Sequence, residues 1–125
     1  MKLNHDCVRD LMLLAEEALD MSNFIRCSNL KLEPYSNQEL IYTASKLIEA
    51  GFIEGKYSKY IDGDCDATIR SITWTGHEFL DNIRDDGVWK NTKDKLSDFK
   101  SASLSFVSNV ASQVLASMIN QKLGL

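Results

Sequence analysis

The chain has few cysteines, one proline and no long apolar run, and each shortage excludes a class of protein. Its three cysteines are odd in number and lack C-x-x-C spacing, which argues against a disulfide framework or a zinc finger and fits a reducing cytosol. No stretch of eighteen apolar residues is present, so we expect no membrane span. Acidic residues interrupt the apolar pattern near the N-terminus, unlike a signal peptide. We therefore expect a cytoplasmic protein.

Positive charge is also scarce. Fourteen Lys and Arg residues stand against eighteen Asp and Glu residues, giving a net charge of −4 and a pI of about 5.1. Strong non-specific nucleic-acid binders are usually basic, so this balance argues against one while leaving a local basic patch open. The length of 125 residues and the apolar content of 44% suffice for a hydrophobic core.

Two amphipathic helices are predicted in the first half of the chain. Apolar residues recur at three- and four-residue steps over Asn4–Asp20 and again over Gln38–Ala50. Asn4 suits the first N-cap, and Ser36 or Asn37 the second. Between them only a weak strand, Asn29–Leu32, is predicted. A helix-turn-helix would need another helix in this interval, so that motif is expected to be reduced or missing.

A β-hairpin and further helices are predicted next. Phe52–Tyr60 and Ala67–Trp74 read as two strands, and the Asp62-Gly63 pair between them favours a turn. Thr75 and Glu78 match a capping box, which predicts that a helix begins at Thr75. Asp85 or Asp86 would cap the helix after it. The expected core residues of this region are Trp74, Phe79, Leu80, Ile83 and Trp89, and the inward face would continue through Val88, Thr92, Leu96 and Phe99.

Three segments of the chain resemble a family of small phage and prophage proteins, domain-of-unknown-function family 2513. The opening KLNHDCVRDLML, the LIEAGFIEG run at Leu47–Gly55 and the GHEFLDNIR run within Thr73–Trp89 are similar to that family. The resemblance covers nearly the whole chain. It implies a winged-helix-like domain in a phage accessory protein, and it implies no activity.

A nucleic-acid site is one reading of the second helix and the hairpin, which would form the recognition helix and the wing. Lysines and tyrosines interleave there, a composition that can contact phosphates. The candidate nucleic-acid-binding residues are Gln38, Tyr42, Lys46, Lys56, Tyr57 and Lys59. Glu39 and Glu49 share the helix face, and the turn containing Asp62, Asp64 and Asp66 is expected to be solvated and to repel phosphate.

Catalytic and metal-binding patterns are not convincing. The Asp62–Asp66 run lacks the glycine at position six and the glutamate at position twelve of an EF-hand. His77, Asp81 and Arg84 share one helix side, but a nucleophile motif does not accompany them, and ordinary helix ion pairs explain the spacing. We therefore expect a non-enzymatic protein with no cofactor and no metal site.

The last helix, from Ser101, is predicted to form an interface. Residues Ser101–Gln121 carry no charge, and their apolar arc is wider than one helix face. A two-fold homodimer is the simplest way to cover it. The expected contact residues are Val107, Val110, Val114 and Met118.

The sequence therefore predicts a mainly α protein with a small β-hairpin. Residues 1–99 would form the winged-helix-like domain, and residues 100–125 an apolar helix packed on that domain or at an oligomer interface. Two functions remain open: a DNA-binding regulator, or a protein–protein interaction module that binds a host or defence factor.

Overall fold

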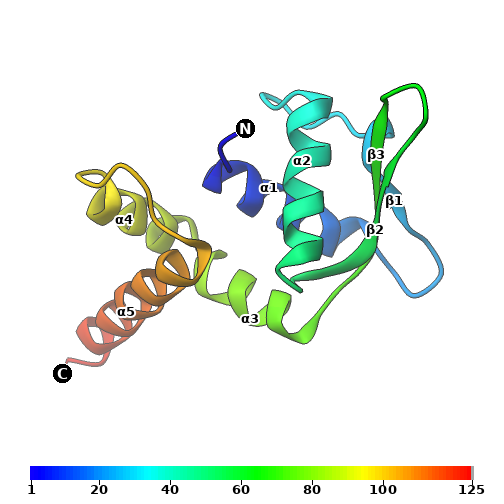
Figure 1. Ribbon diagram of the computed structural model, residues 1–125. Coiled ribbons are helices and arrows are strands. Elements are labelled where there is room, and N and C mark those ends of the chain that lie inside the picture. Colours follow the sequence, from blue (N-terminus) through cyan, green and yellow to red (C-terminus); the bar gives the residue numbers. More distant parts are fainter. Residues whose placement is uncertain (125) are drawn as a thin grey trace. The chain divides into compact units, whose positions relative to one another are not determined.

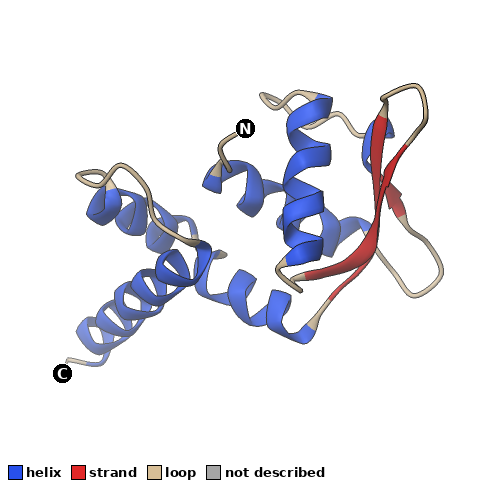
Figure 2. Cartoon of the chain, in the orientation of Figure 1, coloured by secondary structure: helices blue, strands red, loops and turns tan. Residues whose placement is uncertain are grey.

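The computed structural model describes residues 1–124, and over this range the chain is mainly α with a small antiparallel sheet, as predicted (Figures 1 and 2). Within these residues five α-helices and three strands occur. In chain order they are α1 His5–Ala18, β1 Ile25–Arg26, the short 3-10 helix η1 Cys27–Asn29, α2 Asn37–Glu49, β2 Ile53–Lys59, β3 Cys65–Ile72, α3 Trp74–Ile83, α4 Asp86–Leu96 and α5 Leu104–Leu123.

The chain divides into two compact units, Met1–His77 (unit 1) and Glu78–Leu125 (unit 2). The division falls inside α3, whereas the sequence had suggested a boundary between residues 99 and 100. Unit 1 holds the sheet and the first two helices, and its element order is winged-helix-like. Unit 2 holds α4 and α5.

The sheet of unit 1 has the strand order β1-β3-β2, and both pairs are antiparallel. β2 and β3 form the predicted wing, whose turn contains Gly63 at a φ of 93°. The predicted strand at Asn29–Leu32 is wrong. Ile25 and Arg26 pair with β3 instead, because Ile25 can bury its side chain beside Ile69, and the chain then turns into η1.

Two capped helices complete unit 1. Asn4 caps α1 by accepting hydrogen bonds from the backbone N–H groups of Asp6 and Cys7, and Ser36 caps α2 by accepting from Glu39. α2 contacts β2 and β3, and α1 contacts α2 and β3. The buried apolar residues of unit 1 are Cys7, Val8, Leu11, Met12, Ala15, Ile25, Cys27, Leu40, Ala44, Leu47, Ile53, Ala67 and Ile69.

The start of α3 differs from the sequence prediction. The cap is Thr73 rather than Thr75: Thr73 Oγ1 accepts a hydrogen bond from the Gly76 N–H at 3.0 Å and donates to the carbonyl of Gly51. The helix therefore begins at Trp74. Because Trp74 is then a helix residue and not the end of a strand, its side chain is 81% exposed, and its predicted burial is wrong.

Gly76 makes a close approach that no other residue could make. A Cβ at this position would collide with the backbone carbonyl of Phe52, just before β2. The missing side chain therefore lets the start of α3 lie close to the segment before β2.

In unit 2, α4 and α5 pack against each other. Asp85 caps α4 by accepting from the Val88 N–H at 2.9 Å, and Ser103 caps α5 by accepting from the Phe106 N–H at 3.1 Å. The other predicted core residues, Phe79, Leu80, Ile83 and Trp89, are buried as expected, together with Val88, Val107, Ala111 and Val114.

Candidate functional site

The structure gathers three of the six predicted nucleic-acid-binding residues on the α2–wing face, which we define by Tyr42, Lys46 and Tyr57. The ammonium group of Lys46 lies 5.5 Å from the centre of the Tyr42 ring. Tyr57 lies on β2, which packs against α2, close enough for its phenol to feel the charge of Lys46. Sequence spacing alone does not reveal this cluster, because α2 and β2 are separate elements.

The polar groups of the α2–wing face already have partners within unit 1. The Tyr42 hydroxyl donates to the Met1 carbonyl at 3.0 Å, and the Tyr57 hydroxyl donates to Cys65 Sγ at 3.0 Å. Lys46 Nζ lies 2.8 Å from Glu49 Oε2, and this bond raises the pKa of Lys46. The hydrogen bond to Cys65 is the largest influence on Tyr57, and its pKa is raised. A phosphate would therefore meet two phenol donors that are already in use and a lysine whose charge is already balanced by Glu49.

The remaining predicted lysines differ in their relation to this cluster: Lys59 leaves the same face of the sheet as Tyr57, two residues away, and Lys56 leaves the opposite face. Lys56 pairs in register with Thr68 and Lys59 with Cys65 on the neighbouring strand. The two lysines are three residues apart in a regular stretch of β2, so their side chains leave opposite faces of the sheet. Gln38 is exposed in the first turn of α2.

Asp66 does not lie in a solvated turn, as the sequence had suggested. It belongs to β3 and is only 6% exposed. Its Oδ2 accepts hydrogen bonds from Arg26 Nε at 2.8 Å and Ser28 Oγ at 2.7 Å, and its Oδ1 accepts from the backbone N–H groups of Ser28 at 3.0 Å and Ala67 at 2.8 Å. Burial alone would raise the pKa of Asp66, but these donors outweigh it and the pKa is lowered. Asp66 therefore fastens β1 and η1 to β3.

His77 and Asp81 have different partners in the structure. His77 Nδ1 lies 3.8 Å from Glu16 Oε2 of α1, whereas Asp81 accepts from Arg84 at 2.9 Å. The Asp81–Arg84 contact fits the ion-pair interpretation, whereas His77 lies beside Glu16 of another helix and not beside Asp81.

The residues predicted as an α5 interface have different surroundings. Val107 is fully buried and Val114 is 5% exposed, both in the α4–α5 core, whereas Val110 is half-buried and Met118 is 37% exposed. Two buried valines can add little area to a contact with another molecule. The exposed apolar residues of this region are Phe99, Phe106, Met118, Ile119 and Leu123.

A phenylalanine groove, missed by the sequence analysis, lies where α4 leads into α5. It is lined by Leu96, Phe99, Ser101, Ala102, Ser103 and Phe106. Phe99 was expected on the inward face but is 67% exposed, and Phe106 is 46% exposed. The chain leaves α4 at Ser97, so Phe99 no longer follows the helical face that buries Val88 and Trp89.

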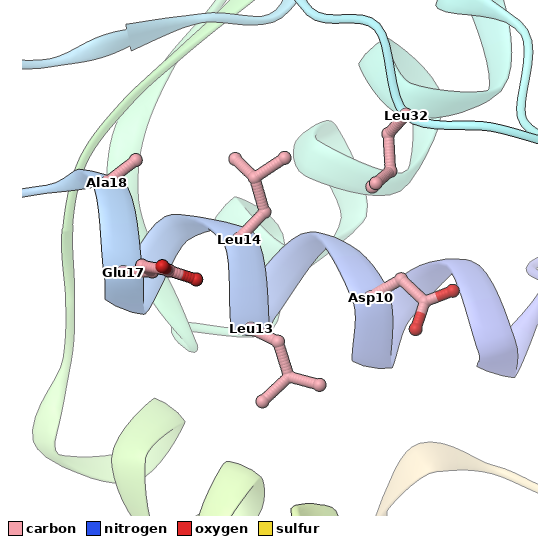
Figure 3. A pocket seen from close by; sticks show the side chains of 6 residues that line it. All are labelled: Asp10, Leu13, Leu14, Glu17, Ala18 and Leu32. Atoms are coloured by element: carbon pink, nitrogen blue, oxygen red, sulfur yellow. The ribbon is translucent and has the colours of Figure 1, made fainter.

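A second missed feature is the α1 groove, an open hollow of about 400 Å³ in unit 1. Its lining residues are Asp10, Leu13, Leu14, Glu17, Ala18 and Leu32. In Figure 3, Leu13 and Leu14 point to opposite sides of the α1 ribbon, and the carboxylates of Asp10 and Glu17 lie along the helix. The spacing D-x-x-L-L-x-x-E is the sequence signal that could have found it, because Asp10 and Glu17 lie two turns apart along one line of the helix and the two leucines flank that line on either side.

Residues 2–103 match the family described as "Hypothetical protein (DUF2513)". The chain belongs to this family. It is also 31% identical over 124 residues to an uncharacterized protein of Haemophilus influenzae, an alignment that spans 98% of this chain and 99% of that protein. No solved structure matches the chain. The family match ends at Ser103, the N-cap of α5, while the similarity to the Haemophilus protein continues through that helix.

The residues that carry the family resemblance around α3 serve the fold. Thr73 caps α3, Gly76 allows the close approach to Phe52, and Asp85 caps α4. Phe79 and Leu80 are buried. These residues of the signature therefore determine how this region folds.

Residues 1–124 lack two further features. Over this range no group of three or more His, Cys, Asp or Glu side chains is arranged to hold a metal ion. In the same residues, no helix combines the length and apolar character needed to cross a bilayer.

Proposed function

We propose that this DUF2513 protein is a non-enzymatic binding protein whose unit 1 recognises another protein. The observation that carries the proposal is the charge of unit 1. Residues 1–77 contain eight Lys and Arg against twelve Asp and Glu, so the whole net charge of −4 resides in the unit with the winged-helix-like order. Such a unit repels phosphate at long range.

The side chains at the surface of unit 1 support a protein partner. Trp74 is 81% exposed, and Phe24, Tyr57, Tyr60 and Ile61 are also exposed. Aromatic residues are enriched in protein interfaces because they bury a large area and carry a polar tip. The paired Lys46 and Glu49 suit such a surface better than a phosphate backbone. In a phage setting the partner would be a host protein or a defence component.

DNA binding is the second candidate, and the order of α1, α2 and the wing favours it. A fluorescence-anisotropy titration with a random-sequence duplex at low salt separates the two. Protein recognition predicts no saturable binding at concentrations below about 10⁻⁴ M, the weak end of the usual non-specific range. If the duplex binds on the face that holds Tyr57, replacing Lys59 by alanine should reduce the slope of log K against log salt by roughly one unit.

The positive half of the test is photocrosslinking in living cells. A benzophenone amino acid placed at Tyr57 should give an adduct that protease destroys and nuclease leaves intact. The same group at Lys90, exposed on α4 of unit 2, serves as the matched control. A nuclease-sensitive adduct at Tyr57, together with saturable duplex binding, would replace the protein partner by DNA.

Self-association through unit 2 is a separate part of the proposal. The exposed apolar residues Phe99 and Phe106 lie at the start of a segment, residues 101–121, that carries no charge. Depletion of charge is typical of the centre of an interface, and a charge-free face can meet its own copy without repulsion. A two-fold dimer would cover the phenylalanine groove.

A further inference from the structure

The α1 groove combines an apolar floor with negative charge at both ends. Leu13, Leu14 and Leu32 are half-buried, so part of each side chain still faces the hollow. Asp10 and Glu17 are seven residues apart on α1, two helical turns or about 10.5 Å. The groove therefore presents leucines between two carboxylates.

The position of one carboxylate is fixed by a neighbour. The Tyr35 hydroxyl donates to Asp10 Oδ2 at 2.7 Å. Burial first, and this hydrogen bond second, raise the pKa of Tyr35, so the phenol stays a donor at neutral pH. A carboxylate has about four acceptor sites, which leaves Asp10 able to accept further bonds from a cationic group. Glu17 is exposed at the other end.

We propose that the α1 groove docks a helical protein segment in which two apolar side chains lie between two basic ones. This inference rests on the protein-binding function proposed above and names the chemistry of the partner. The leucines would receive the apolar side chains, as in other helix-in-groove complexes. The carboxylates of Asp10 and Glu17 would receive lysine or arginine two turns apart. The partner segment would thus carry basic residues at the spacing at which α1 carries the acidic residues of its D-x-x-L-L-x-x-E pattern.

The probe is a fluorescein-labelled helical peptide with the pattern K-x-x-L-L-x-x-K on an alanine and glutamine background. The full chain should raise its anisotropy in a saturable manner, and a peptide with glutamate in place of lysine should not bind. The double variant Asp10→Asn, Glu17→Gln should weaken binding at least tenfold. The substituted asparagine still offers an oxygen to Tyr35, and circular dichroism checks that the fold persists.

The matched control removes two exposed carboxylates elsewhere, Asp64→Asn with Glu78→Gln, and changes the net charge equally. It should bind as the parent does. Equal weakening by both double variants would show a general charge effect and overturn the site. So would the absence of binding at millimolar peptide, or amide shifts in ¹⁵N spectra that avoid Leu13, Leu14 and Leu32.

The outcome is distinguishable from that of the proposed function. A protein adduct at Tyr57 without peptide binding would remove the α1 groove and leave the protein-binding function standing. Peptide binding at the groove, together with a nuclease-sensitive adduct at Tyr57 and saturable duplex binding, would keep the α1 groove as a peptide site and replace the proposed function of the α2–wing face by DNA binding.

Discussion

Replacing Asp66 by asparagine should destabilise unit 1 in a pH-dependent way. Asparagine has nearly the same shape, and its oxygen can still accept from the backbone N–H groups of Ser28 and Ala67. Its amide, however, would place a donor where Oδ2 accepts from Arg26 Nε and Ser28 Oγ. The variant therefore loses the negative charge and a charge-assisted hydrogen bond.

The magnitude follows from these contacts. Hydrogen bonds to charged groups contribute about 1.5–3 kcal/mol each. The Arg26 side chain is 53% exposed, so solvent screens its attraction and the lower part of that range applies. We expect a loss of about 2 kcal/mol at pH 7, or roughly 8–16 °C in the unfolding midpoint of a unit this size. Asp66→Ala removes all four acceptor contacts and should cost about 3–5 kcal/mol.

The pH dependence has a definite sign. The pKa of Asp66 is lower in the folded chain than the unfolded value of about 3.9, so its contribution is fully present above that value. It is lost as the pH falls through the folded pKa, because the carboxyl becomes protonated. The difference between the parent and Asp66→Asn should therefore be constant at neutral pH and shrink in acid.

Urea unfolding followed by circular dichroism measures this difference across a pH series. Asp64→Asn, an exposed carboxylate of the same hairpin, is the control and should stay within about 0.5 kcal/mol of the parent. Two results would refute the reasoning. One is an Asp66→Asn variant as stable as the parent at pH 7, and the other is a deficit that persists unchanged below the folded pKa.

Three further predictions concern α3 and α5. Thr73→Ala should cost about 1 kcal/mol in urea unfolding through the lost cap, whereas Thr75→Ala should cost less; the opposite order would place the cap at Thr75. Gly76→Ala should destabilise the fold by at least about 1–3 kcal/mol, because the new methyl group meets the Phe52 carbonyl, and an unchanged midpoint would contradict that close contact. Light scattering across a dilution series should show a dimer for the parent, a monomer for Phe106→Lys and a dimer for the control Asn109→Lys; a parent monomer at every concentration would end the dimer proposal.

Local signals in the sequence predicted most of the fold. The caps at Asn4 and Asp85, the apolar stripes of α1 and α2, and the Asp62-Gly63 turn each involve residues a few positions apart, and each appears in the structure. Taken in chain order, the two helices and the hairpin give unit 1 its winged-helix-like arrangement of elements.

The errors arise where a distant residue decides the conformation. Thr73 bonds to the Gly51 carbonyl, 22 residues away, and this contact starts α3 before Thr75. Asp66 bonds to Arg26 and Ser28, which precede it by 40 and 38 positions in the sequence. Because these partners are distant, the local run of aspartates resembled a solvated turn. Contacts between residues so far apart produce no periodic pattern in a single sequence.

The candidate surfaces were harder to predict than the fold. Tyr42 and Lys46 are four residues apart on α2, so their proximity was visible. Glu49 shares that face of the helix, and its ion pair with Lys46 neutralises the charge on which a phosphate contact would depend. The α1 groove also includes Leu32, which lies outside α1 in the sequence and is brought beside the helix only by folding.

The fastening of β1 by Asp66 has a consequence for the order of events during synthesis. β1 has two residues, and its partners on β3 lie some forty positions later in the chain. A ribosome that has released only the first sixty residues has exposed Ile25 and Arg26 but neither Thr68 nor Ile69. The N-terminal edge of the sheet must then wait, with Ile25 in water, until β3 has emerged. Non-local closure of this kind slows folding, and the nascent chain carries an unpaired apolar segment until the wing is complete.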